Sequence, residues 1–148
     1  MDGQANSGEI LITVFAVGDT MLGMDSARVQ EIITFRRPVF VHHAPDFIDG
    51  IINLRGRIIT TISLSRKLGL DSSLEDAERH IIIIDHMNEQ IGLVIDGVSN
   101  NIVIESDMIA GTPANILPEQ SRFFSGVYQA ESQLVAILNL EAVLEAGM

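Results

Sequence analysis

Four side chains between residues 42 and 49 are of types that bind transition metals. They are two adjacent histidines, His42 and His43, and two carboxylates, Asp46 and Asp49. Imidazole nitrogens and carboxylate oxygens are common zinc ligands. Neighbouring residues of an extended segment point to opposite sides, however, so both histidines reach one ion only if the backbone bulges there. We therefore expect no metal site and no cofactor at this group.

Two further carboxylates, Asp85 and Asp96, could form a general acid–base pair. Both residues lie at the ends of predicted strands, next to turns. Aspartate is favoured at such positions because its side chain bonds to nearby backbone amides. The chain shows no nucleophile and base in a recognisable arrangement. We expect structural roles for both carboxylates and no enzymatic activity.

The segment 50–70 has the pattern of a docking surface. Gly50 leads into an apolar strand that ends at a single charged residue, Arg55, and Gly56 then turns the chain into a second apolar strand, Arg57–Leu64. A guanidinium held between two buried strands presents a fixed fork of donors to a carboxylate or a carbonyl. It could equally brace the adjacent loop through an intramolecular bond, and the residues alone leave both interpretations open.

The composition and the spacing of turn residues favour a mainly β fold. Hydrophobic residues make up 47% of the 148 residues and aromatic residues only 5%, so the apolar content is largely aliphatic, as in pleated strands. The apolar run 80–85 should be buried on both faces, and Met21, Met24, Met87 and Met108 should fill the core. Short helices are expected at 26–30, 65–68 and 140–146, the last capped by Asn139. The expected strands cover residues 10–17, 21–24, 31–35, 39–41, 51–54, 57–64, 80–85, 90–95, 98–104, 124–130 and 133–138.

The expected strands fit two small, closed or nearly closed barrels better than one sandwich. Residues 1–9 are polar and are expected to form a flexible arm. Residues 10–148 are expected to form a single domain of two lobes, roughly 10–79 and 80–148. The polar stretch 71–79 is the best internal boundary, and strand exchange between the lobes is left open.

The charge of the chain is unevenly distributed. The net charge is −11, yet eight of the nine basic residues lie between Arg28 and Arg79. From His80 onward, Arg122 is the one basic residue against nine acidic ones. Such a chain repels nucleic acid and anionic lipid at long range. The two halves could offer patches of opposite sign to a protein partner; for the acidic half, a solvated surface that aids solubility is the favoured interpretation.

The sequence carries no sign of secretion or membrane insertion. It has no cysteine, which is compatible with a reducing compartment. The first residues are polar and lack the basic region of a signal peptide. No apolar run reaches the roughly 18 residues that a spanning helix needs. We expect a soluble, cytoplasmic protein.

Several segments, in their order and spacing, resemble the motifs of a known family. Each motif is weak alone, but together they extend from about Ile12 to Leu144. On these residues the chain resembles the CheW-like domain family of bacterial chemotaxis coupling proteins, and the like-folded regulatory domains of their kinases. The segments are 15–18, 22–25, Val29-Gln30-Glu31-Ile32, 44–50, 50–56 and 91–99.

The resemblance implies two SH3-like five-stranded β-barrel lobes packed side by side around a shared apolar seam, with a few short helices. It also implies a non-catalytic adaptor. Its partners would be the cytoplasmic tip of a chemoreceptor (a methyl-accepting chemotaxis protein) and the regulatory domain of a CheA-type histidine kinase. Neither nucleic acid nor direct membrane insertion is expected, and the adaptor would be recruited to membrane-associated receptor arrays.

Carried over by position, the resemblance also implies a receptor-binding groove. One wall would come from the segment 29–32 and the other from the segment 50–56, with a weaker candidate in the second lobe. The residues are Val29, Glu31, Ile32, Gly50, Asn53, Arg55, Gly56 and, as the weaker candidate, Val98.

The chain departs from the family pattern in two places. Thr60 and Ser63 stand where the family usually has proline and aspartate, and Asn100-Asn101 where it tends to have an acidic and then an apolar residue. Ser63 can still cap the following helical turn. The departures leave the partner open: an adaptor of another chemosensory histidine-kinase pathway, in motility or development, is the alternative. A small-barrel module for a ligand or nucleic acid is a distant one, because it would need exposed aromatic residues on a basic face.

Overall fold

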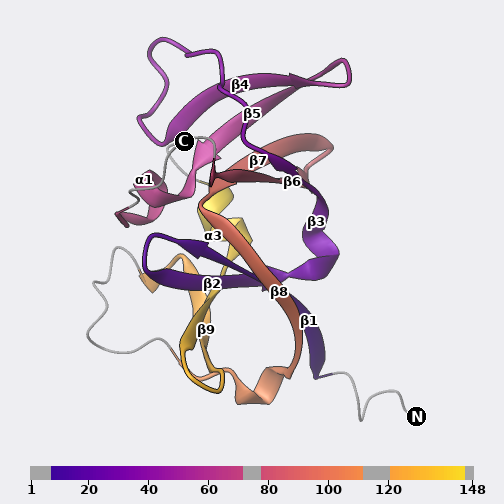
Figure 1. Cartoon of the computed structure of the whole chain (residues 1–148), viewed down its shortest axis with the longest axis vertical. Coiled ribbons are helices and arrows are strands. Elements are labelled where there is room, and N and C mark those ends of the chain that lie inside the picture. The colour runs from indigo at the N-terminus through magenta and orange to yellow at the C-terminus, as the bar shows by residue number, and fades with distance from the viewer. Residues whose placement is uncertain (1–7, 72–77, 112–120, 146–148) are drawn as a thin grey trace.

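A computed structural model describes residues 8–71, 78–111 and 121–145 (Figure 1). In these ranges the chain forms ten strands and four short helices, so the fold is mainly β, as predicted. The strands are β1 (Glu9–Val17), β2 (Thr20–Asp25), β3 (Val29–Thr34), β4 (Ile48–Leu54), β5 (Arg57–Ser63), β6 (His80–His86), β7 (Glu89–Ile95), β8 (Gly97–Glu105), β9 (Phe124–Gln129) and β10 (Leu134–Leu138). The helices are η2 (Ser26–Arg28), α1 (Leu64–Leu68), η4 (Ser106–Met108) and α3 (Leu140–Leu144).

The strands form two five-stranded sheets, each the body of one lobe. Lobe A has the strand order β8-β1-β2-β10-β9, and lobe B has the order β3-β6-β7-β5-β4. In Figure 1 lobe B lies above lobe A. Among the described strands, the two end strands of each sheet do not pair with each other, so the lobes are curved, open sheets rather than closed barrels.

The sheets divide the chain differently from the expected halves 10–79 and 80–148. Lobe B is one continuous block from β3 to β7, whereas lobe A combines β1 and β2 with β8, β9 and β10. The strands β6 and β7 therefore complete the sheet that β3 begins, and β8 returns to pair with β1. Glu9, predicted to belong to the N-terminal arm, is the first residue of β1. The rest of the predicted arm, residues 1–7, lies outside the described ranges.

Strand β6 shows how the two lobes share one seam. Ile81 to Ile84 are all 0% exposed, which confirms that this run is buried on both faces. Successive side chains of a strand alternate in direction. Ile81 and Ile83 accordingly join the interior of lobe B, with Ile52, Leu54, Ile59 and Val94, while Ile82 and Ile84 join the seam between the lobes.

The seam is the largest apolar cluster of the described chain. It combines Phe15, Leu22 and Met24 of lobe A with Leu93 and Ile95 of lobe B, and helices α1 and α3 close it. Burying such a side chain stabilises the fold by about 1.5–3 kcal/mol. Lobe A has its own interior, formed by Ile12, Val14, Ile104, Val135 and Ile137.

The methionines match the core prediction in part. Met24 is fully buried in the seam and Met21 packs against the interior of lobe A. For Met87 and Met108 the prediction is wrong, because they are 82% and 62% exposed. Met87 has a positive φ of 52° in the tight β6–β7 turn, where the chain reverses at the surface. Met108 ends helix η4, which contains no buried residue.

The helices of the described ranges are short. No helix there combines the length and the apolar content needed to cross a membrane. Asn139 caps α3 as predicted, by accepting a hydrogen bond from the amide of Ala142 at 3.2 Å. Ser63 caps α1 by accepting one from the amide of Arg66 at 3.4 Å, and Gly69 ends that helix in the left-handed conformation.

Candidate docking site

The structure gathers seven of the eight predicted site residues in lobe B. Val29, Glu31 and Ile32 lie on β3, Gly50 and Asn53 on β4, and Arg55 and Gly56 form the β4–β5 turn. These two strands are the ends of the sheet order, so curvature of the sheet brings its two edges toward each other. The eighth residue, Val98, lies on β8 of lobe A, where it pairs with Phe15 and is 40% exposed.

An ion pair between Arg55 and Glu31 spans the gap between the two edges. The Arg55 side chain remains 67% exposed and that of Glu31 35% exposed. A second contact runs alongside, because Arg36 Nη1 donates to the backbone oxygen of Asn53 at 2.8 Å. An exposed ion pair contributes at most about 1 kcal/mol to stability. Arg55 is thus both a weak internal brace and an accessible donor.

The turn that carries Arg55 is a tight hairpin. Arg55 and Gly56 have φ values of 53° and 86°, the combination of a type I′ turn, whose twist matches that of the flanking strands. The side-chain oxygen of Asn53 accepts a hydrogen bond from the amide of Gly56 at 3.0 Å and so stabilises the turn. The three residues therefore act together: Asn53 and Gly56 shape the turn, and Arg55 projects from it.

Gly50 allows a close approach of two backbone segments. Its φ is 149°, and a Cβ atom there would lie 2.3 Å from the backbone oxygen of Val39. Val39 exchanges two backbone hydrogen bonds with Ile51, of 2.8 and 3.0 Å. The strand expected at 39–41 is accordingly reduced to a single bridge at Val39. Gly50 thus keeps the segment before β4 packed against that strand.

Val29 and Ile32 have mixed environments. Both are half-buried and pack against the seam cluster. They anchor β3 to that cluster and leave part of their surface accessible to solvent. The pairing register of β3 with β6 shifts between Val29 and Glu31.

A polar cavity of about 420 Å³ adjoins Arg55. Of its six lining residues, Arg55 alone is among the predicted site residues, and the other five were missed. Arg57, the first residue of β5, lies just after the turn that carries Arg55. Two guanidinium groups and one carboxylate suit a partner that offers carboxylates or backbone carbonyls. The lining residues are Gln30, Leu54, Arg55, Arg57, Asp85 and Gln90.

The two carboxylates considered as an acid–base pair, Asp85 and Asp96, lie in different environments. Asp96 is 5% exposed; its Oδ2 accepts a hydrogen bond from the Gly18 amide at 2.5 Å, and its Oδ1 lies 3.7 Å from Arg79 Nε. It thus joins the β1–β2 turn of lobe A to the residue before β6 of lobe B. The Asp85 residue is exposed. The structural interpretation of Asp96 is confirmed.

One amine at the seam has a perturbed acidity. Burial, and secondarily the nearby Arg122 guanidinium, lower the pKa of Lys67. Its Nζ lies 4.2 Å from the ring centre of Phe47 and 5.2 Å from that of Phe123. Cation–π contacts of this kind favour the charged amine and oppose part of the burial effect.

Within the described ranges, no group of three metal-ligating side chains is found.

The two-lobed architecture defines a class of β proteins with solved members. A crystal structure of the scaffolding protein TtCheW from Thermoanaerobacter tengcongensis superposes with a TM-score of 0.84, at 28% sequence identity over 93% of this chain and 89% of that one. The chain belongs to the CheW-like domain family, whose model matches residues 12–148.

Curated relatives agree with this membership. The chemotaxis protein CheW of Rhizobium meliloti is 30% identical over 139 residues, which cover 93% of this chain and 88% of the relative. The probable chemotaxis protein CheW of Rhizobium etli is 27% identical over 139 residues, with 93% and 89% covered. The chemotaxis protein CheW of Bacillus subtilis is 26% identical over 145 residues, with 98% and 92% covered.

Proposed function

We propose that this protein is a non-catalytic adaptor that couples the cytoplasmic tips of chemoreceptors to a CheA-type histidine kinase in chemotaxis signalling. The observation that carries the proposal is the gathering of seven of the eight implied groove residues at the facing edges of β3 and β4. Family membership over residues 12–148 and the chemotaxis names of the relatives support it.

In this proposal the receptor tip docks against lobe B. Arg55 supplies donors to a carboxylate or carbonyl of the receptor, and Glu31 limits the orientations that Arg55 adopts before binding. Half-buried Val29 and Ile32 offer apolar contact beside these charges. A central arginine surrounded by apolar contacts is a common arrangement of binding hot spots. Binding would hold the protein at membrane-associated receptor arrays without inserting it into the membrane.

Coupling follows if a second face binds the kinase at the same time. Each partner then biases the geometry of the other, with a coupling free energy of about 1–3 kcal/mol in typical allosteric systems. The two lobes share one continuous core at the seam, which transmits strain because protein interiors are closely packed. The adaptor thus needs no catalytic group to pass a conformational change onward.

Substituting Arg55 tests the docking site. Arg55→Ala and Glu31→Arg should each weaken binding to a receptor hairpin fragment about tenfold, since hot-spot arginines contribute more than 1 kcal/mol. The free energy of unfolding should change by less than about 1 kcal/mol, because the ion pair is exposed. Isothermal titration and urea denaturation measure the two quantities.

Arg122→Ala is the matched control for Arg55→Ala, because Arg122 is also exposed but lies beside Phe123 and is not part of the β4–β5 turn. Receptor affinity of this control should stay within about twofold of the unmodified protein. Unchanged receptor binding in both Arg55→Ala and Glu31→Arg would place the receptor elsewhere on the surface.

A further inference from the structure

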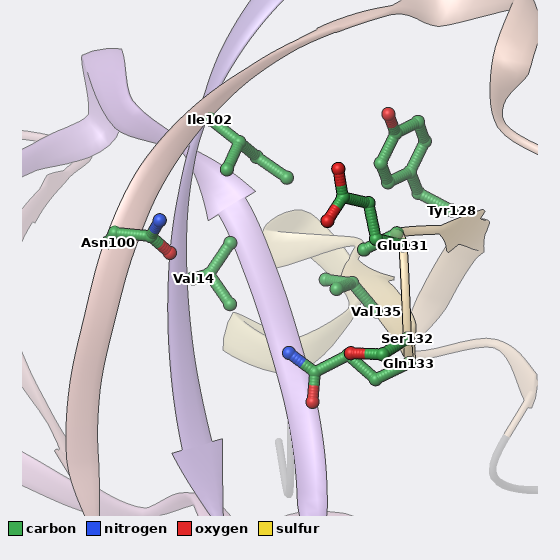
Figure 2. A pocket seen from close by; sticks show the side chains of 9 residues that line it. Val14, Asn100, Ile102, Tyr128, Glu131, Ser132, Gln133 and Val135 are labelled. Carbon is green, nitrogen blue, oxygen red and sulfur yellow. The ribbon is translucent and has the colours of Figure 1, made fainter.

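A second cavity, of about 380 Å³, lies in lobe A. Figure 2 shows Asn100 and Ile102 of β8 on one side of it and the β9–β10 hairpin on the other. Its volume falls in the range of cavities that hold a ligand side chain or a small molecule. The lining residues are Val14, Asn100, Ile102, Tyr128, Ala130, Glu131, Ser132, Gln133 and Val135.

The floor of this cavity is the apolar interior of lobe A. Val14 and Val135 are 2% and 1% exposed and belong to the core cluster. Ile102, Tyr128 and Ala130 are only partly buried and pack against that cluster from the cavity walls. An apolar side chain placed in the cavity would therefore extend an existing core. It would be removed from water by packing against these apolar residues, which is favourable.

The walls of the cavity are strand edges at the open side of the sheet. Strands β8 and β9 are the two ends of lobe A. Among the described strands, β8 pairs with β1 alone, and β9 pairs with β10 and has one further bridge, from Val127 to Ala110. Open edges of this kind present backbone donors and acceptors that can accept an additional strand.

The charge around the cavity selects the sign of a ligand. Glu131 is the one charged residue among its lining residues, and Figure 2 shows its carboxylate between the side chains of Ile102 and Tyr128. Over the described residues from His80 onward, Arg122 is the single arginine or lysine. Complementary charge favours a basic ligand and speeds its association.

We propose that this cavity binds an extended segment of a partner protein that presents an apolar residue and, two positions along, a lysine or arginine on the face turned to the cavity. The segment lies along the open edge of β8, seats an apolar side chain on Val14 and Val135, and brings a basic side chain to Glu131. None of the eight implied groove residues lines this cavity, so the proposal stands or falls independently of the receptor assignment.

Three labelled hexapeptides test the site on the full chain. The first carries valine and lysine two residues apart on one face, with threonine between them. The second has glutamate for lysine, and the third is the lysine peptide with alternate amides N-methylated. Fluorescence anisotropy should show the lysine peptide binding at least about tenfold more tightly than the glutamate peptide. N-methylation should weaken it about fivefold or more, because strand addition needs those amides. Amide NMR shifts should centre on Asn100, Ile102 and Tyr128.

Two variants localise the binding. Glu131→Gln should weaken the lysine peptide about fivefold, as expected for one partly exposed charge pair. Ser132→Trp, a substitution in the exposed β9–β10 turn, should block the cavity and weaken the peptide about tenfold or more without changing the melting temperature. The matched control is Glu105→Gln, at an exposed acid of strand β8 that does not line the cavity. Its effect should be under about twofold.

Several results would overturn the proposal. Absence of binding, equal affinity for the glutamate peptide, or NMR shifts outside lobe A would exclude a basic segment at this cavity. Equal losses of lysine-peptide affinity in Glu105→Gln and Glu131→Gln would show that the peptide responds to the overall negative charge and not to Glu131 at the cavity. Undiminished binding of the N-methylated peptide would exclude strand addition.

Discussion

Alanine in place of Gly50 is expected to lower the free energy of unfolding by about 3 kcal/mol, through backbone strain and overpacking. The φ of 149° lies in a region that side chains disfavour, and the added Cβ would meet the Val39 oxygen at 2.3 Å and the Val39 carbonyl carbon at 2.9 Å. Both contacts are to backbone, so no side-chain rotation relieves them. Urea denaturation followed by circular dichroism measures the change.

Loss of this packing should also weaken receptor binding, because Gly50 holds the segment before β4 against the wall of the groove. Gly97→Ala is the matched control. A Cβ at Gly97 meets nothing within 4 Å and its φ lies outside the positive region, so its stability should change by less than about 0.5 kcal/mol. Equal stabilities of the two alanine variants would contradict the packing role of Gly50.

Asp96→Ala is the second substitution with a large expected effect. It removes a buried carboxylate that contacts the Gly18 amide in one lobe and Arg79 in the other. Breaking a buried charge pair by removing one partner costs about 3–5 kcal/mol. The Asp96 and Arg79 side chains are only 7% and 24% exposed, so solvent replaces the lost contacts poorly. We expect a loss of about 3 kcal/mol in the free energy of unfolding.

Asp85→Ala serves as the control for this substitution. Asp85 also lies near the end of a strand of lobe B, but it is exposed, and its backbone oxygen, not its side chain, accepts a hydrogen bond from Arg28. Its replacement should cost less than about 0.5 kcal/mol. A result in which Asp85→Ala destabilises as much as Asp96→Ala would remove the case for an inter-lobe contact at Asp96.

Local structure could be predicted because its signals are local. Expected strands such as 10–17, 57–64 and 90–95 match β1, β5 and β7 to within one residue at each end. The Asn139 cap and the Ser63 cap each depend on residues within one helical turn. Near residue 30 the prediction was less accurate: the helix ends at Arg28 and β3 begins at Val29, so tertiary pairing with β6 prevails over the helical signal.

Long-range pairing could not be predicted in the same way. The apolar run 80–85 predicted a strand buried on both faces, but nothing within it shows that β6 pairs with β3 and completes lobe B. The parallel pairs β5–β7 and β10–β2 likewise join segments whose individual patterns carry no partner information. Asp96 was expected to bond to backbone, yet its partner at Gly18 is 78 residues away.

For the candidate site too, single residues could be predicted from the sequence, but the contacts between them could not. Arg55 stood out by type and position, and the resemblance pointed to Glu31, but their mutual ion pair depends on curvature that brings β3 and β4 together. The cavity residues Asp85 and Gln90 belong to the β6–β7 hairpin and reach Arg55 only in the folded lobe. No spacing in the sequence encodes that proximity.

A charge swap tests the central claim, that Arg55 recognises a partner rather than merely bracing the lobe. The double variant Arg55→Glu, Glu31→Arg keeps an ion pair across the two edges while it reverses the charge that the turn offers to a partner. Its free energy of unfolding should stay within about 1 kcal/mol of the unmodified protein.

Titration of this double variant with a receptor hairpin fragment is the most direct measurement. Our account predicts affinity at least about tenfold weaker than that of the unmodified protein, although the internal pair is restored. Recovery of the original affinity in the double variant, after a loss in Arg55→Ala, would show that Arg55 acts only through Glu31 and would contradict the docking role.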